Sequence, residues 1–426
     1  MLLRRSLWLG LLGAGLLGGL PAGARTLEAP AAKLEAQLKQ LVEGQSTPGI
    51  AALILRDGKP IYSRINGVQA PGQAAPISLD QMFRYASMTK PVTSVAALIL
   101  VEDGKLRLDA PISEYLSAFA DLMVRQPDGS MTKAARPPTI KELLTHTAGF
   151  SYNFINRPGF VDAYAKAGVV DGLSDPAVTT AVAMRSLASA PLAYQPGAEW
   201  HYSLATDVLG AVIEQVTGNP LGAFVTERIA KPLKLDSWVF NAPVSQRDRF
   251  VTVTRPTQPT MALGSGFVTV ATAEAVPFPS TKGTAMLDPE RAFSPTAYNS
   301  GGGGMSGSVS DYARFGQMLL NGGELDGARI LKRETVQMMT SNQVSPSMVN
   351  LRGPGWGFGL GVAMVTDPAA AKTAQPAGSY GWGGIYGTGF WVDPVNNVVG
   401  VVMTQTAIIG SGPIANAVRE AFYAAE

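Results

Sequence analysis

The sequence lacks cysteine entirely and contains only two histidines, His146 and His201, among its 426 residues. Without cysteine the chain can form no disulfide bridge and carry out no thiolate chemistry, so its fold must rest on packing. The two histidines belong to no HExxH motif and to no His-rich cluster, which argues against a zinc site. We therefore expect neither a metal nor a cofactor.

Charge is also scarce, because charged residues make up 15% of the chain and the formal net charge is +2. Such a chain has no strong electrostatic field to attract nucleic acid or an anionic membrane surface. We therefore expect neither nucleic acid nor a membrane surface as a partner. The length allows one large core or two coupled ones and leaves the oligomeric state open.

Residues 1–24 are predicted to be a cleavable signal peptide. A basic pair, Arg4 and Arg5, precedes an apolar run from Leu7 to Leu20, and residues 22–24 (Ala-Gly-Ala) have the pattern of a cleavage site. The apolar run is shorter than the roughly 20 residues of a spanning helix, which argues against a permanent anchor. We expect a periplasmic or secreted protein, and the arginine pair leaves both the general and the twin-arginine routes open.

The pattern of apolar residues and turns predicts an α+β fold. A helix is expected at 27–42, a hairpin at 49–67 turning at Asp57-Gly58, and a helix from Pro91 to about Gly104. Near the other end, 355–365, 378–394 and 397–406 are predicted as three strands and 412–426 as a closing helix. Short loops imply antiparallel pairing. We predict an antiparallel sheet flanked by helices, built from 25–109 and 305–426, and a mostly helical, loop-rich insertion domain at 110–304.

The tetrapeptide Ser-Met-Thr-Lys occurs twice, from Ser87 to Lys90 and from Ser130 to Lys133. A serine three residues before a lysine on a helix has that lysine as a neighbour, as a nucleophile and its base require. The second copy lies between turn-forming residues, where nothing fixes its lysine against its serine. The first copy precedes an apolar helix whose Pro91 is tolerated only in the first turn, so Ser87 is expected at the helix N-terminus.

By itself the first copy is equally compatible with a helix cap at Ser87 and a solvated Lys90. Two other segments favour chemistry. Tyr202 precedes a predicted helix and offers a second proton-transfer group, and burial of Lys90 would favour the neutral form that a base needs. The strand segment 382–385 (Trp-Gly-Gly-Ile) contains two glycines without side chains, so a substrate could lie along its backbone.

Together the motifs S-x-x-K, Y-S and W-G-G, with LLTHTAGF at 143–150 and the glycine run at 301–304, resemble those of the class C β-lactamase-like serine hydrolases. Within that group the chain is most similar to the family VIII carboxylesterases. The resemblance covers nearly the whole chain after residue 24. It implies the fold shared by β-lactamases and penicillin-binding proteins.

The resemblance also implies roles for individual residues. Ser87 would be the nucleophile, Lys90 its general base, and Tyr202 the group that passes a proton to the leaving alcohol and activates the deacylating water. The backbone N–H groups of Ser87 and Ile385 would form the oxyanion hole. One such donor is typically worth about 3–4 kcal/mol in the transition state.

Substrate contacts are expected at Trp382, Gly383, Gly384 and Leu204, and two of these depart from the β-lactamase pattern. Leu204 stands where those enzymes have an asparagine amide, and Trp382 stands where they have a lysine. An indole offers one N–H donor and an apolar face in place of a charge. Both differences favour neutral, apolar esters over β-lactams.

Several further residues are expected to have structural or supporting roles. His146 is expected to be structural because the chain has no G-x-S-x-G elbow for it to serve. His201 is expected either to adjust the reactivity of Tyr202 or to have only a surface or capping role. Asp207 is expected to cap its helix or to pair with another group, with no part in the chemistry. The glycine run at 301–304 is expected to be tight backbone near the site. Four aromatic residues could line an acyl pocket or simply fill the core: Tyr152, Trp356, Tyr386 and Phe390.

The sequence thus favours an exported serine carboxylesterase that works through an acyl-enzyme on Ser87. A β-lactamase, a D-amino-acid peptidase or an amide hydrolase of the same fold is the second hypothesis. A penicillin-binding sensor that is acylated without turnover is the third. The natural ester, and whether the acyl group passes to water or to another alcohol, are left open.

Overall fold

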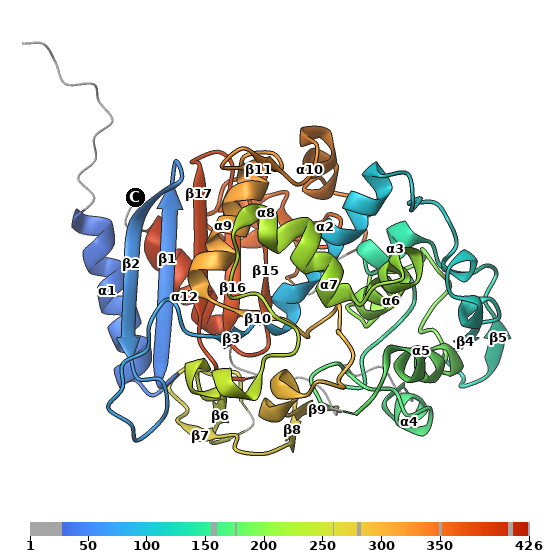
Figure 1. Cartoon of the computed structure of the whole chain (residues 1–426), viewed down its shortest axis with the longest axis horizontal. Helices are drawn as coiled ribbons and strands as arrows, with labels where there is room; N and C mark the ends of the chain where they lie inside the picture. The colour runs from blue at the N-terminus through green and yellow to red at the C-terminus, as the bar shows by residue number, and fades with distance from the viewer. Residues whose placement is uncertain are drawn as a thin grey trace, which may run out of the picture.

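The computed structural model describes residues 28–154, 160–174, 177–258, 260–278, 283–348, 352–407 and 412–424. The predicted signal peptide at 1–24 lies outside these ranges, so its cleavage stays a prediction. A seven-stranded antiparallel sheet forms the centre of the molecule (Figure 1). In spatial order its strands are β13 (Trp356–Phe358), β14 (Ala363–Val365), β15 (Tyr380–Gly384), β16 (Thr388–Asp393), β17 (Val398–Met403), β1 (Gly49–Arg56) and β2 (Lys59–Gly67).

Both ends of the chain build this sheet, as predicted. The N-terminal strand β1 pairs with the C-terminal strand β17, with Ala52 opposite Val402. The turn between β1 and β2 lies at Asp57-Gly58, whose φ angles of 51° and 74° are those of the tight turn typical of two-residue hairpins. The helix predicted at 27–42 is also confirmed, as α1 (Glu28–Glu43).

The predicted number of C-terminal strands is wrong. Segments 355–365 and 378–394 each contain two strands, β13 with β14 and β15 with β16, instead of one. Gly361 and Gly387 lie between the members of each pair with φ angles of 94° and 82°, which only glycine adopts readily. Because glycine is abundant in both segments, the sequence did not reveal which glycines turn the chain.

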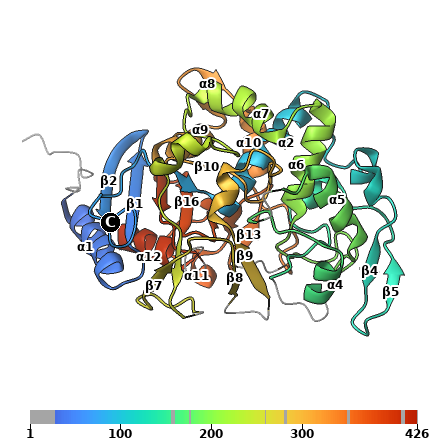
Figure 2. The same cartoon turned by 60° about the horizontal axis from the view of Figure 1, so that its bottom comes forward.

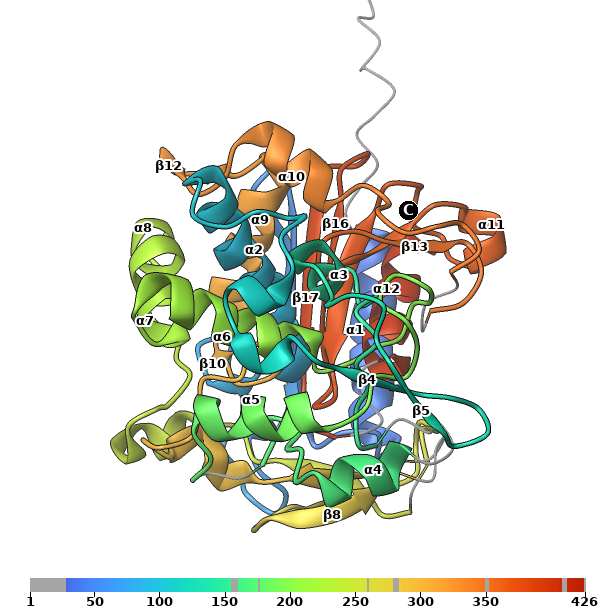
Figure 3. The same cartoon turned by 90° about the vertical axis from the view of Figure 1, so that its right-hand side faces the viewer.

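Helices cover both faces of the sheet. Figure 3 shows α1 and α12 on one face and α9 on the other, and Figure 2 shows α1 and α12 side by side next to the β1–β2 hairpin. Side chains on β17 alternate accordingly: Val398 and Val402 pack in the cluster with α1 and α12, whereas Val399 and Val401 belong to the larger core with α9. The helices are α1, α2 (Thr89–Glu102), α3 (Ile140–Leu144), α4 (Phe160–Lys166), α5 (Thr180–Ser189), α6 (Ala205–Thr217), α7 (Leu221–Val225), α8 (Lys231–Leu233), α9 (Val309–Leu320), α10 (Arg333–Met339), α11 (Pro368–Ala371) and α12 (Pro413–Tyr423).

The part of the chain from 110 to 304 carries α3 to α8 and long irregular segments (Figure 1). Its treatment as a separate insertion domain at 110–304 stays a prediction. Among the described residues, no helix combines the length and apolarity needed to cross a membrane. The remaining strands form two-stranded pairs: β3 (Phe83–Arg84) with β10 (Ser306–Gly307), β4 (Met123–Arg125) with β5 (Met131–Lys133), β6 (Thr254–Pro256) with β7 (Phe267–Thr269), β8 (Glu274–Pro277) with β9 (Thr284–Leu287), and β11 (Glu324–Leu325) with β12 (Ala328–Arg329).

The packing of α1 on the sheet can be tested with Leu38→Ala. Leu38 is fully buried in the cluster that joins α1 to α12, so its truncation should lower the free energy of unfolding by about 2–5 kcal/mol in a denaturant titration. The neighbouring Lys39→Ala serves as the control, since Lys39 is exposed and forms only a surface ion pair with Glu43. Equal effects of the two substitutions would contradict this account of the packing.

Candidate active site

Ser87 lies in a short 3₁₀ turn, Ala86–Met88, that leads directly into α2. Twelve consecutive residues of α2, from Thr89 to Leu100, are buried, so the turn is attached to a helix enclosed on all sides. Ala86 has a φ angle of 47°, in the left-handed region that disfavours residues other than glycine. The predicted helix N-terminus at Ser87 is therefore confirmed, with a strained residue directly before it.

Lys90 lies one helical turn after Ser87 and is 1% exposed. Its Nζ donates to Ser87 Oγ at 3.2 Å, to the Tyr152 hydroxyl at 2.9 Å and to the Gly302 carbonyl at 2.7 Å. These three acceptors use all three donors of an ammonium group. Lys90 is thus a buried, fully hydrogen-bonded group and not a solvated surface charge.

Tyr202 reaches the same serine from the segment before α6. Its hydroxyl donates to Ser87 Oγ at 2.5 Å, and Lys90 Nζ lies 4.6 Å from the centre of its ring. Ser87 Oγ therefore accepts hydrogen bonds from both predicted proton-transfer groups. The fold brings these three residues together although Tyr202 is 115 positions from Ser87.

The second Ser-Met-Thr-Lys copy occupies an exposed hairpin. Ser130 donates to Asp128 Oδ1 at 2.7 Å, and Lys133 forms an ion pair with Asp121 at 2.7 Å. Strand β5 turns the side chain of Lys133 into solvent, where 69% of it is exposed. The serine and lysine of this copy are engaged separately, as the flanking turn residues predict.

Strand β15 passes directly beside the Ser87 turn. A Cβ on Gly384 would lie 2.2 Å from the Tyr85 carbonyl oxygen, so only glycine permits this approach. Thr388 holds the same carbonyl with a hydrogen bond of 2.9 Å. The residue after the strand, Ile385, then lies in the wall of the cavity that contains Ser87.

The cavity above Ser87 has a volume of about 680 Å³. Of the predicted substrate contacts, Trp382 and Gly383 line it, whereas Gly384 and Leu204 are not among its lining residues. Leu204 is 2% exposed at the start of α6. Of the four aromatic residues considered, Tyr152 and Trp356 line the cavity, and Tyr386 and Phe390 do not. Its other apolar lining residues include Phe154, Leu173, Met261 and Phe278.

The two histidines make no hydrogen bond to Ser87. His146 is 1% exposed, packs against the rings of Tyr202 and Phe358, and shares a hydrogen bond of 3.2 Å with Ser203. Burial, together with the charge of Lys90, holds the pKa of His146 well below its usual value, so the imidazole is neutral. This packing is consistent with the structural role predicted for it. His201 pairs through Nε2 with Ser151 Oγ at 3.1 Å.

The sequence does not reveal two partners of Lys90. It predicts Tyr152 only as a pocket or core aromatic, and the glycine run only as tight backbone near the site. Burial and the neighbouring Tyr202 hold the pKa of Tyr152 well above its usual value, so its hydroxyl keeps its proton. No local signal connects Tyr152 or Gly302 with Lys90, because 62 and 212 positions separate them from it.

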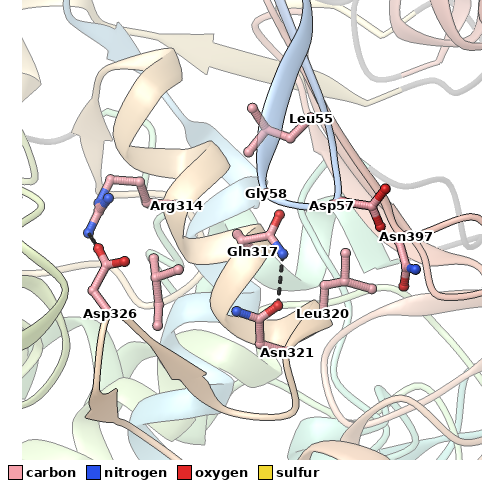
Figure 4. A pocket seen from close by; sticks show the side chains of 10 residues that line it. Leu55, Asp57, Gly58, Arg314, Gln317, Leu320, Asn321, Asp326 and Asn397 are labelled. Carbon is pink, nitrogen blue, oxygen red and sulfur yellow. Dashed lines mark hydrogen bonds and ion pairs between the residues drawn. The ribbon is translucent and has the colours of Figure 1, made fainter. Parts of the chain in front are cut away.

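A second cavity, of about 480 Å³, lies at the far end of α9 beside the turn between β1 and β2. Figure 4 shows that its polar side chains pair with one another: Arg314 donates to Asp326 at 2.6 Å and Gln317 donates to Asn321 at 2.8 Å. None of the residues lining it is a serine, lysine or tyrosine. Of these two cavities, the first alone is lined by Ser87 and Tyr202.

The family model for Beta-lactamase matches residues 34–423, and the chain therefore belongs to the beta-lactamase family. Esterase EstB of Burkholderia gladioli is 38% identical over 397 residues, which cover 92% of this chain and 95% of that protein. These matches confirm the predicted family and, with it, the predicted enzyme class, a serine carboxylesterase.

Solved structures confirm the fold. EstCE1, described as a hydrolase with promiscuous acyltransferase activity, superimposes with a TM-score of 0.83 at 32% identity, covering 93% of this chain and 99% of its own. The LovD6 variant of simvastatin synthase from Aspergillus terreus superimposes with a TM-score of 0.73 at 22% identity, over 95% of this chain and 99% of its own. At that identity the second likeness concerns the fold alone.

The lowered pKa of His146 predicts a stability that depends on pH. The folded protein binds this proton more weakly than the unfolded chain, so the free energy of unfolding should fall as the pH drops below about 6.5. One such group contributes a slope of at most about 1.4 kcal/mol per pH unit. Denaturant titrations of the wild type and His146→Gln between neutral and acidic pH measure this dependence of the free energy of unfolding on pH. A slope that His146→Gln leaves unchanged would contradict this assignment.

Proposed function

We propose that the protein hydrolyses neutral, apolar carboxylic esters through an acyl-enzyme on Ser87. The observation that carries this proposal is the convergence of Lys90 Nζ and the Tyr202 hydroxyl on Ser87 Oγ, at 3.2 and 2.5 Å. Nucleophile and base within hydrogen-bond reach are the geometric requirement for covalent catalysis of this kind. No metal or cofactor enters the proposal.

The proposed reaction has two steps. With Lys90 in its neutral form, its amine accepts the proton of Ser87 while Oγ attacks the ester carbonyl carbon. The bond to the alcohol oxygen then breaks, and the alcohol leaves with a proton relayed through Tyr202. In the second step a water molecule attacks the acyl carbon, gives its proton to the same groups, and releases the acid and Ser87.

We assign the oxyanion hole to the backbone N–H groups of Ser87 and Ile385. The close approach of β15 at Gly384 supports this assignment, because it brings the chain at Ile385 next to the Ser87 turn. Donors fixed in the backbone need no reorganisation when charge develops on the carbonyl oxygen. The side chain of Ile385 is not needed for this role.

We base the preference for apolar acyl groups on the aromatic part of the cavity wall, which also contains charged residues such as Arg352 and Arg419. Tyr152 and Phe154 stack with ring centres 4.6 Å apart, and Phe154 stacks in turn on Phe278 at 5.5 Å. On the other side Trp382 packs against Tyr202 with ring centres 5.5 Å apart. Aromatic walls around a few convergent polar groups are typical of sites for small apolar ligands. The indole of Trp382 cannot attract the carboxylate of a β-lactam as a lysine would.

Replacement of Ser87 tests the nucleophile. Ser87→Ala should lower kcat/KM for p-nitrophenyl butyrate by about a thousandfold or more, because no acyl-enzyme can form. Ser130→Ala is the matched control, since it removes the serine of the second copy, and it should keep wild-type activity. Progress curves for both variants measure the effect.

The same assay discriminates between the substrate classes. A chromogenic cephalosporin offered beside the ester should be the poorer substrate of the wild type. If the cephalosporin is turned over faster, the inference from Trp382 and Leu204 is wrong. A burst of one product per protein molecule without steady turnover would favour a penicillin-binding sensor over an esterase.

We further propose that the protein is exported and loses residues 1–24. When the full chain is expressed with its leader in a Gram-negative host, mass spectrometry of the periplasmic or secreted protein should find an N-terminus at Arg25. Changing both Arg4 and Arg5 to lysine distinguishes the routes, because the twin-arginine route depends on this pair. Recovery of only the uncleaved chain from the cytoplasm would contradict export.

A further inference from the structure

Asp207 is a buried carboxylate that the proposed reaction does not use. It lies in the first turn of α6 and is 2% exposed. Its Oδ1 accepts hydrogen bonds from Ser300 Oγ at 2.5 Å and from the Tyr298 hydroxyl at 3.2 Å. Both donors are neutral, so they orient the carboxylate without balancing its charge.

The other oxygen of Asp207 lies against the backbone of Gly302. A Cβ on Gly302 would lie 2.2 Å from Asp207 Oδ2, so this approach requires glycine at that position. The carbonyl of the same residue accepts the hydrogen bond of 2.7 Å from Lys90 Nζ. A single glycine thus contacts the carboxylate on one side and the lysine on the other.

Lys90 has no carboxylate among its own hydrogen-bond partners in the described part of the chain, since it donates to a hydroxyl, a phenol and a carbonyl. A buried ammonium group with neutral partners alone is costly unless an opposite charge lies nearby. Asp207 supplies this negative charge from the other side of Gly302. Its own pKa reflects the arrangement: burial raises it, while the charge of Lys90 and the hydrogen bond from Ser300 lower it.

We propose that Asp207 is a positioning residue for the reaction, which acts on Lys90 through Gly302. The carboxylate fixes the Gly302 loop at the distance from which its carbonyl holds Lys90 toward Ser87. Its negative charge also lies close enough to interact with the lysine. The inference rests on the proposed roles of Ser87 and Lys90 and goes beyond them, because Asp207 is not among the residues that line the cavity and its hydrogen bonds go to Ser300 and Tyr298.

Other titratable groups around this pair are accounted for. Burial holds the pKa values of Tyr152 and Tyr298 well above their usual value, and burial holds that of His146 well below it, so these three stay neutral near neutral pH. Arg291 also faces the pair and lowers the pKa of Asp207. Two further groups face the pair: Tyr202, which bonds to Ser87, and Asp171, whose charge acts on Tyr152.

Asp207→Asn tests the proposal, because it removes the charge and keeps the shape. The asparagine oxygen can face Gly302 while its amide faces Ser300 and Tyr298, whose hydroxyls accept as well as donate. With p-nitrophenyl butyrate, kcat/KM should fall about tenfold or more. The acid limb of its pH profile should move to lower pH by on the order of one unit, because loss of the negative charge favours the neutral lysine.

Tyr298→Phe is the matched control, since it removes a hydrogen bond to Asp207 and leaves the charge in place. Its acid limb should coincide with that of the wild type. An Asp207→Asn protein whose acid limb is also unchanged would overturn the proposal and leave Asp207 a merely structural residue, whatever its activity or melting temperature.

Labelling by an organofluorophosphate separates this inference from the proposed function. Ser87 Oγ bonds to phosphorus as fluoride leaves, and peptide mapping identifies the modified serine. Labelling of Ser87 in the wild type and in the well-folded Asp207→Asn protein, more slowly in the variant at neutral pH, supports the inference. A wild type that is never labelled at Ser87 would overturn the proposed function itself.

Discussion

The buried amino group of Lys90 is the constraint on which the rest of the site depends. A charge-bearing group that is 1% exposed must find partners for all its protons, and here they come from three parts of the chain. One is Ser87 in the turn just before α2, another is Tyr152 after α3, and the third is the Gly302 carbonyl before β10. Satisfying this one group therefore fixes the helix, the loop and the aromatic wall relative to one another.

The sheet serves the same site from the other side. Strand β15 approaches the Ser87 turn so closely that Gly384 is required, and it ends at the cavity wall. The adjacent strand β16 and the next strand β17 are buried on both faces, between α9 and the α1–α12 pair, which holds β15 rigidly beside the site. Fixed backbone donors are useful in catalysis because they do not have to reorganise. The layered packing thus has a direct chemical consequence.

The aromatic walls connect binding with catalysis. Tyr202 donates to Ser87 Oγ through its hydroxyl, and its ring packs against both Trp382 and Tyr152. A substrate held by these rings would therefore lie against the group that is proposed to protonate its alcohol. The same packing excludes water from Lys90. Family relationship to β-lactamases is compatible with a different substrate class, because small changes in a pocket redirect one fold to another substrate.

Local spacing in the sequence was enough to predict some features of the structure but not others. Three-residue spacing on a helix places Lys90 beside Ser87, and Asp57-Gly58 specifies its hairpin, because both depend on a few neighbouring backbone angles. The turn residues around Ser130 likewise indicated that nothing holds the lysine of the second copy against its serine. In contrast, the strands at 355–365 and 378–394 were miscounted, since which of several glycines turns the chain is decided by pairing partners.

The sequence alone is enough to identify the family, the fold and the serine, lysine and tyrosine that meet. The three-dimensional arrangement was needed to find which neutral groups hold Lys90, which aromatic residues face the cavity, and that Asp207 lies on the other side of Gly302 from the lysine. Tyr386 and Phe390 differ from Tyr152 and Trp356 in nothing that their local sequence reveals. The physical reason is that burial and hydrogen-bond partners depend on contacts between residues tens to hundreds of positions apart, which no local pattern encodes.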